Sequence, residues 1–78
     1  MKNWKYIGWD NEDGLPCVLA FNPHAGEHAA HVPPNVTPLS AGFVNSVIIK
    51  GKVVFHISGS STSLNLYPRP EDSEAFNL

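Results

Sequence analysis

The chain has 78 residues, of which 42% are hydrophobic and 15% charged, and its net charge is −2. This is the length of one small domain, and the composition excludes a disordered tail, which is richer in charge and poorer in apolar residues. The 5 basic residues are scattered, so we expect no nucleic-acid partner, because binding to phosphates needs a clustered basic surface.

Cys17 is the only cysteine, whereas small secreted domains usually carry an even set that forms disulfides. We therefore expect a cytoplasmic protein in which Cys17 is a buried, small apolar residue. No apolar run follows the basic N-terminal residues, and later runs are too short to cross a bilayer, so we expect no leader and no membrane partner. A domain this short buries only about 60% of the surface that its unfolded chain exposes, so a metal or a partner chain would help to stabilise it.

The first third of the sequence predicts a hairpin and then a short helix. Trp4–Trp9 and Leu15–Phe21 are rich in residues that favour strands, and the polar run Asp10–Gly14 between them ends in Asp-Gly, a frequent turn. Asn22 is a good helix N-cap and the proline after it suits the first helical position, which predicts a helix over Pro23–His31.

The middle of the chain predicts a second hairpin, Gly42–Ile49 and Lys52–Ser58, around a two-residue turn. Such a turn pairs Ile49 with Lys52, and strand alternation then sorts the side chains onto two faces. The face that we expect to pack on the helix carries Val44, Ser46, Ile48, Val53, Phe55 and Ile57. The opposite, mixed face carries Phe43, Asn45, Val47, Ile49, Lys52, Val54, His56 and Ser58.

Two further elements complete the predicted fold. Ser63–Tyr67 alternates like a strand, and Pro70 followed by two acidic residues predicts a short helix over Pro70–Asn77. We therefore predict a single α+β domain over residues 1–78, in the order ββαβββα. Its antiparallel sheet has four to five strands, with one short helix packed on it and a short C-terminal helix.

Large apolar residues suggest a surface for a protein partner. Trp4, Tyr6 and Trp9 crowd one short strand, and alternation places at least one large ring outside the core. Aromatic residues dominate the energetics of protein interfaces. The candidates for partner binding are this strand and the mixed hairpin face with Phe43, Val47, Ile49 and Val54.

Three histidines form a second candidate site. His24, His28 and His31 have the spacing i, i+4 and i+7 of one helix face, and two histidines one turn apart can share zinc or nickel. One ion does not reach both His24 and His31, so His56 or Glu27 would have to complete the set. A solvated, histidine-rich helix face is the alternative interpretation.

A run of hydroxyl residues around Gly59 forms a third candidate, in which Ser60, Ser61 and Arg69 would bind a small ligand or a phosphate. The phosphate-loop and nucleophile-elbow patterns are both missing. An ordinary turn between two strands also accounts for these residues.

Three segments of the sequence are Ser-Ala-Gly-Phe-Val at 40–44, Ser-Leu-Asn-Leu at 63–66 and Arg-Pro-Glu-Asp at 69–72. With these segments the chain resembles, over roughly residues 15–76, a family of small bacterial proteins that are often carried on prophages or other mobile elements. His28 matches the helix histidine of that family, whereas His24, His31 and the loop 35–38 depart from its pattern. The resemblance implies no activity and favours an accessory protein.

The sequence as a whole predicts a small, non-catalytic interaction module that binds another protein and forms a homodimer. Two alternatives stay open: a metal-binding protein that uses the three histidines, and a binder of small ligands at the serine-rich turn. No cofactor is expected unless the histidines bind a metal.

Overall fold

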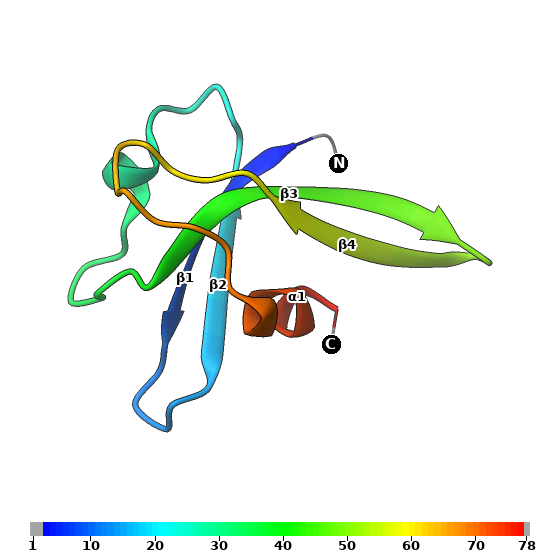
Figure 1. The fold of residues 1–78 in the computed structure, drawn as a ribbon, viewed down its shortest axis with the longest axis horizontal. Coiled ribbons are helices and arrows are strands. Elements are labelled where there is room, and N and C mark those ends of the chain that lie inside the picture. Colours follow the sequence, from blue (N-terminus) through cyan, green and yellow to red (C-terminus); the bar gives the residue numbers. More distant parts are fainter. Residues whose placement is uncertain (1–2, 78) are drawn as a thin grey trace.

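A computed structural model describes residues 3–77. Four strands form one antiparallel sheet in the order β2-β1-β3-β4, and a C-terminal helix packs against it (Figure 1). The α+β class is therefore confirmed. The elements are β1 (Trp4–Asp10), β2 (Pro16–Phe21), the single 3-10 turn η1 (His28–His31), β3 (Ser40–Ile49), β4 (Lys52–Ser58) and the helix α1 (Pro70–Phe76).

The β1–β2 hairpin forms as predicted, and its turn explains the polar run. The Asn11 carboxamide oxygen accepts the backbone N–H groups of Asp13 at 2.9 Å and Leu15 at 3.0 Å. Gly14 has φ +77° and donates its N–H to the Asn11 carbonyl at 3.0 Å. The Asn11 N–H donates to the Leu15 carbonyl at 2.9 Å, which leaves a loop of three residues between them. A left-handed glycine at the end of such a loop is a favoured way to join two antiparallel strands.

The helix predicted over Pro23–His31 is wrong in extent, because only its last turn, η1, is helical. The Asn22 side chain accepts the His24 N–H at 2.8 Å, which makes a local turn instead of capping a helix. Gly26 then has φ +119°, outside the helical region. Asn22 and Gly26 therefore form turns in the segment where we expected a helix.

The strand predicted over residues 63–67 is also wrong. Residues 62–65 form turns, Asn65 has φ +55°, and only an isolated bridge joins Ser61 to Leu66. A left-handed residue breaks the extended backbone that a strand needs. Within residues 3–77 the sheet therefore has four strands, and the order ββαβββα is not observed.

The predicted register of the second hairpin is confirmed, since Ile49 pairs with Lys52. Lys50 and Gly51 both have positive φ, at 52° and 79°, as a two-residue type I′ turn requires. Part of the first predicted face packs on a helix, but that helix is α1, and Ile48 and Val53 on the same face are exposed. The ring of Phe76 lies 5.3 Å from that of Tyr6 and 5.8 Å from that of Phe55.

The opposite face of the sheet is covered by η1 and the loop before it. The His28 ring lies 5.7 Å from those of Phe21 and Phe43. The sheet is therefore sandwiched between two small elements, and the molecule is thin, with extents of 38 × 31 × 17 Å.

The apolar core of this thin molecule is small. Cys17 is half-buried, so the prediction that it is buried was too strong. The buried apolar residues are Tyr6, Ile7, Phe21, Ala41 and Val44. The large hydrophobic residues left exposed outnumber them: Leu15, Leu19, Leu39, Val47, Ile48, Ile49, Val53 and Tyr67. Such a core gives a domain of this size little stability by itself.

Gly8 in β1 allows α1 to come close to the sheet. A Cβ atom at this position would clash with the Ser40 hydroxyl and would lie 2.8 Å from Oδ1 of Asp72. We expect Gly8→Ala to lower the free energy of unfolding by about 2 kcal/mol through overpacking, as measured by urea denaturation. An unchanged stability would contradict the close approach of α1.

Candidate functional site

The outer half of the β3–β4 hairpin projects from the rest of the molecule. Among residues 3–77, β1 pairs with β3 only between Ser40 and Val44, so beyond this point β3 pairs with β4 alone. Figure 1 shows the hairpin extending away from β1, β2 and α1. We call residues 46–55 the arm. A two-stranded ribbon without a third strand or a covering layer is marginally stable in water.

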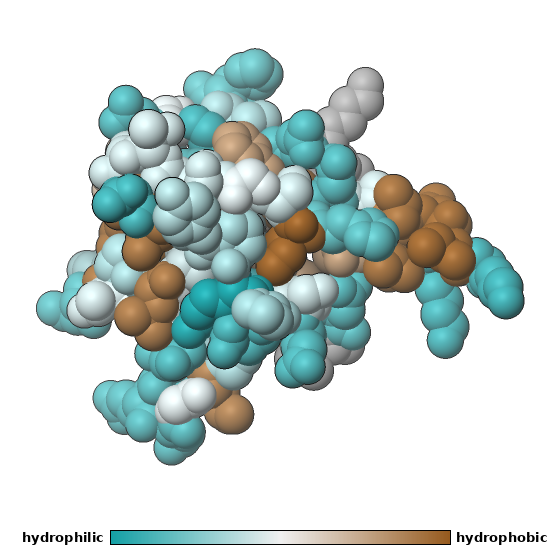
Figure 2. Space-filling model, in the orientation of Figure 1, coloured by the Kyte–Doolittle hydropathy of each residue, from teal (hydrophilic) through white to brown (hydrophobic). Residues whose placement is uncertain are grey.

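The arm is apolar on both faces. Ile48 is 76% exposed, Val53 57%, Ile49 49% and Val47 41%. Ile48 and Val53 are cross-strand neighbours on the face that also carries α1, and Val47 and Ile49 lie on the other face. Figure 2 shows a brown, hydrophobic cluster on this projection, with teal, hydrophilic groups beyond it. Because contiguous exposed apolar patches are common at interaction sites, the arm is a candidate for such a site.

The base of the arm is fixed by the end of α1. The side-chain amide of Asn77 donates to the Phe55 carbonyl at 3.0 Å, and its oxygen accepts the Phe55 N–H at 2.8 Å. The same amide nitrogen donates to the Ser73 carbonyl at 2.8 Å. Asn77 therefore supplies to the edge strand β4 the pair of bonds that a neighbouring strand would supply.

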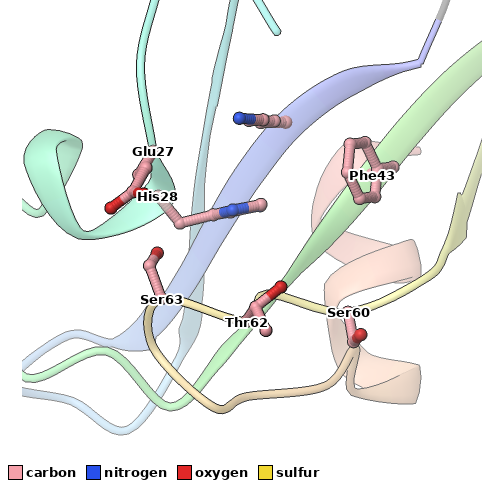
Figure 3. Close-up of a pocket in the computed structure, with 7 residues that line it drawn as sticks. Glu27, His28, Phe43, Ser60, Thr62 and Ser63 are labelled. Carbon is pink, nitrogen blue, oxygen red and sulfur yellow. The ribbon is translucent and has the colours of Figure 1, made fainter.

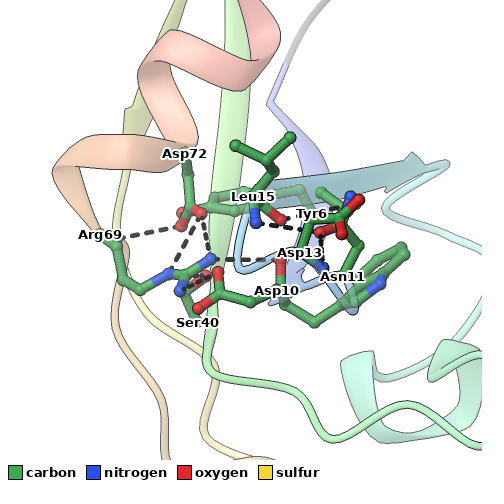
Figure 4. A network of polar contacts seen from close by, with 10 residues as sticks. Tyr6, Asp10, Asn11, Asp13, Leu15, Ser40, Arg69 and Asp72 are labelled. Carbon is green, nitrogen blue, oxygen red and sulfur yellow. Dashed lines mark hydrogen bonds and ion pairs between the residues drawn. The ribbon is translucent and has the colours of Figure 1, made fainter.

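A buried polar network fixes the start of α1 (Figure 4). The Asp72 carboxylate is fully buried and accepts the Tyr6 hydroxyl at 2.9 Å. It also accepts the guanidinium of Arg69 at 3.0 Å and the Arg69 backbone N–H at 3.1 Å. Arg69 extends the network to the Asp10 carboxylate at 2.9 Å and to the Ser40 hydroxyl at 3.2 Å.

The network changes the acid–base properties of two of its members. Burial, and then the hydrogen bond to Asp72, raise the pKa of Tyr6 well above its ordinary value of 10.0, so the phenol stays neutral. Burial alone would lower the pKa of Arg69, but its bonds to Asp10 and Asp72 outweigh this effect and raise it. Tyr6 thus stays neutral and Arg69 stays positively charged. Fixed charge states suit a structural network, whereas a group that transfers protons needs a pKa near the working pH.

A shallow cavity of about 440 Å³ lies on the η1 side of the sheet. Lys5 donates from Nζ to the Gly26 carbonyl at 2.9 Å, and His28 Nε2 is bonded to the Gly42 carbonyl at 2.8 Å. Figure 3 shows Glu27 and His28 on one side and the loop hydroxyls on the other. The lining residues are Lys5, Glu27, His28, Phe43, Ser60, Thr62 and Ser63.

The three predicted metal ligands have separate surroundings. His28 is buried and bonded as described, whereas His31 Nε2 is bonded to the Ala25 carbonyl at 2.9 Å and its ring stacks on Phe21 at 4.0 Å. His24 is exposed. Among the described residues, no three His, Cys, Asp or Glu side chains gather as a metal site would need.

The predicted ligand-binding residues are also separated. Ser60 lines the cavity on the η1 side, and Ser61 is buried with its hydroxyl accepting the Leu64 N–H at 3.2 Å. Arg69 belongs instead to the Asp72 network. The structure thus brings Arg69 together with carboxylates of its own chain and not with the serines.

The candidates for partner binding divide according to exposure. Tyr6 is fully buried and cannot contact a partner, while Val47 and Ile49 lie exposed on the arm. Trp4, Trp9, Phe43 and Val54 are half-buried. Sequence reasoning missed Ile48 and Val53, which we expected under the helix. The signal was the length of the second hairpin, whose first strand, β3, has 10 residues, whereas β1 has 7 and β2 has 6.

Comparisons with protein-family models, with curated proteins and with solved structures find no match for this chain. No helix within residues 3–77 has both the length and the apolar character to cross a membrane.

Asn77 offers a test of how the arm is held. We expect Asn77→Ala to remove both bonds to Phe55, to lower the free energy of unfolding by about 1 kcal/mol, and to speed hydrogen exchange of the Phe55 amide. Asn77→Asp keeps an acceptor for the Phe55 amide but has no donor for the Phe55 carbonyl. In this variant the exchange rate of the Phe55 amide should therefore lie between the rates in the wild type and in Asn77→Ala. Equal exchange in all three proteins, measured by NMR, would contradict the clamp.

The buried hydroxyl of Tyr6 should make the folded protein less stable at alkaline pH. Its raised pKa means that the folded protein holds the phenolic proton more tightly than the unfolded chain. The neutral Tyr6 hydroxyl therefore contributes its full stabilisation of the folded state below pH 10.0, and this contribution is lost as the pH rises above that value. In Tyr67→Phe, where Tyr6 is the only tyrosine, tyrosinate absorbance should appear together with loss of the folded circular dichroism signal. Ionisation while that signal persists would disprove the prediction.

Proposed function

We propose that this protein is a small, non-catalytic interaction module whose arm binds another polypeptide. The observation that carries the proposal is the exposure of Val47, Ile48, Ile49 and Val53 on a ribbon that the rest of the fold leaves uncovered. Complete burial of a fully exposed Val or Ile side chain contributes about 1.5–3 kcal/mol, and each of these partly exposed side chains can contribute a share of that amount. A partner would thus supply the covering layer that the arm lacks.

The rigidity of the arm base supports this role. Asn77 and Phe76 hold Phe55 from one side, and α1 is itself fixed through Asp72. A preorganised element loses less conformational freedom on binding than a mobile loop does. The fold therefore presents the apolar ribbon in a defined orientation.

The two other predicted functions receive less support from the geometry. The histidines bond to different carbonyl groups, and Arg69 is engaged by two carboxylates. The resemblance to proteins of mobile elements agrees with an accessory role, and the cytoplasmic location remains a prediction.

The proposal predicts that arm substitutions weaken partner binding without unfolding the protein. Ile48→Thr with Val53→Thr keeps residues that favour strands but removes apolar surface. We expect the affinity to fall more than tenfold, since tenfold corresponds to about 1.4 kcal/mol. The partner is captured from the host lysate with the wild-type protein, and its Kd for each variant is then measured by calorimetry with purified components.

Leu39→Thr is the control, because Leu39 is also an exposed aliphatic residue, at 44%, but lies outside the arm. It should bind like the wild type. Equal affinities for the arm variant and the wild type would contradict the proposal.

A further inference from the structure

An apolar groove lies on the same face of the sheet as Ile48 and Val53, but near the β1–β2 turn. It has a volume of about 430 Å³, and its lining is Asn11, Leu15, Pro16, Glu74 and Ala75. Leu15 is 59% exposed, so this groove, like the arm, leaves a large aliphatic side chain in water. One molecule therefore carries an uncovered apolar projection and an uncovered apolar recess.

The charges around these two features are opposite. Lys50 and Lys52 are exposed at the tip of the arm, and Glu74 lines the groove. Glu12 and Asp13 are exposed in the adjoining β1–β2 turn. Within residues 3–77, the ion pairs involve Arg69 alone, so neither lysine meets an acidic group of its own chain.

We infer that the polypeptide bound by the arm is a second copy of this chain, with each arm lying in the groove of the other copy. The inference rests on the proposed function and names its partner. Ile48 and Val53 would meet Leu15, Pro16 and Ala75, while Lys50, in the turn at the tip of the arm, would face Glu74 and the acidic turn. Lys52 lies on the opposite face of the arm, where it adds to the positive charge of the tip. Burial of the aliphatic side chains supplies the affinity, and the opposite charges fix the orientation.

A twofold axis doubles this contact. In an isologous dimer each arm–groove contact occurs twice, so a small patch on one chain yields two sites of burial. Two copies would also cover the groove and the Ile48 and Val53 face of the arm of each chain at once. A partner that covered only the arm would leave Leu15 in water.

A charge exchange tests the inference. One variant carries Lys50→Asp and Lys52→Glu, which makes the arm acidic; Asp suits the positive φ of position 50. The other carries Glu12→Lys and Glu74→Lys, which makes the groove basic. All four positions are exposed, so the circular dichroism spectra should match that of the wild type.

We expect the wild-type protein to form dimers in sedimentation equilibrium, and each variant alone to associate at least tenfold more weakly. In a mixture of the two variants, acidic arms meet basic grooves and basic arms meet acidic grooves. The mixture should therefore form a one-to-one heterodimer, which native mass spectrometry distinguishes from either homodimer. Glu71→Lys, also on α1 and exposed but outside the groove lining, should leave the dimer unchanged.

Three results would overturn the inference: a monomeric wild-type protein, variants that dimerise like the wild type, or a mixture that fails to pair. A monomer that binds vesicles of anionic lipid through its lysines would assign the arm to a membrane surface. A monomer whose arm binds a different polypeptide would refute self-recognition but leave the proposed function standing. Substitutions in the arm that change neither self-association nor the capture of another polypeptide would refute both this inference and the proposed function.

Discussion

The Asp72 carboxylate, buried against Gly8, is the constraint on which the rest of the structure depends. A buried carboxylate is costly unless every oxygen is bonded and a positive charge is near. The Tyr6 hydroxyl and the Arg69 guanidinium meet both needs, and they come from the central strand and from the residue before α1. The network therefore ties the C-terminal helix to the middle of the sheet at one defined place.

The position of α1 determines what the sheet leaves uncovered. With its start fixed over Gly8, the seven-residue helix reaches Phe55 through Phe76 and Asn77 and ends there. Everything beyond Phe55 on the hairpin lies outside its reach. The exposed arm is thus a direct result of a short helix fixed at one end, combined with a neighbouring strand, β1, that stops pairing at Val44.

The hairpins could be predicted from sequence because their signals are local. Asp10–Gly14 and Lys50-Gly51 specify their turns through residues that accept left-handed backbone conformations. The helix over Pro23–His31 failed because Asn22 can cap a helix or close a turn, and Gly26 decided for the turn. Sequence reasoning missed the exposure of Ile48 and Val53, since it depends on the length of the hairpin and also on how far β1 and α1 extend alongside it. Alternation assigned both residues to the correct face but cannot show whether anything covers that face.

The narrow junction at Phe55 separates two sets of evolutionary constraints. Substitutions around Asp72, Gly8 and Tyr6 alter the stability of the whole domain, so selection for folding acts on them directly. Beyond Phe55, several side chains of the arm are exposed and touch little of their own chain, so the fold places few demands on them. With the arm as the binding surface that we propose, substitutions there would alter the binding preference while the scaffold stays unchanged.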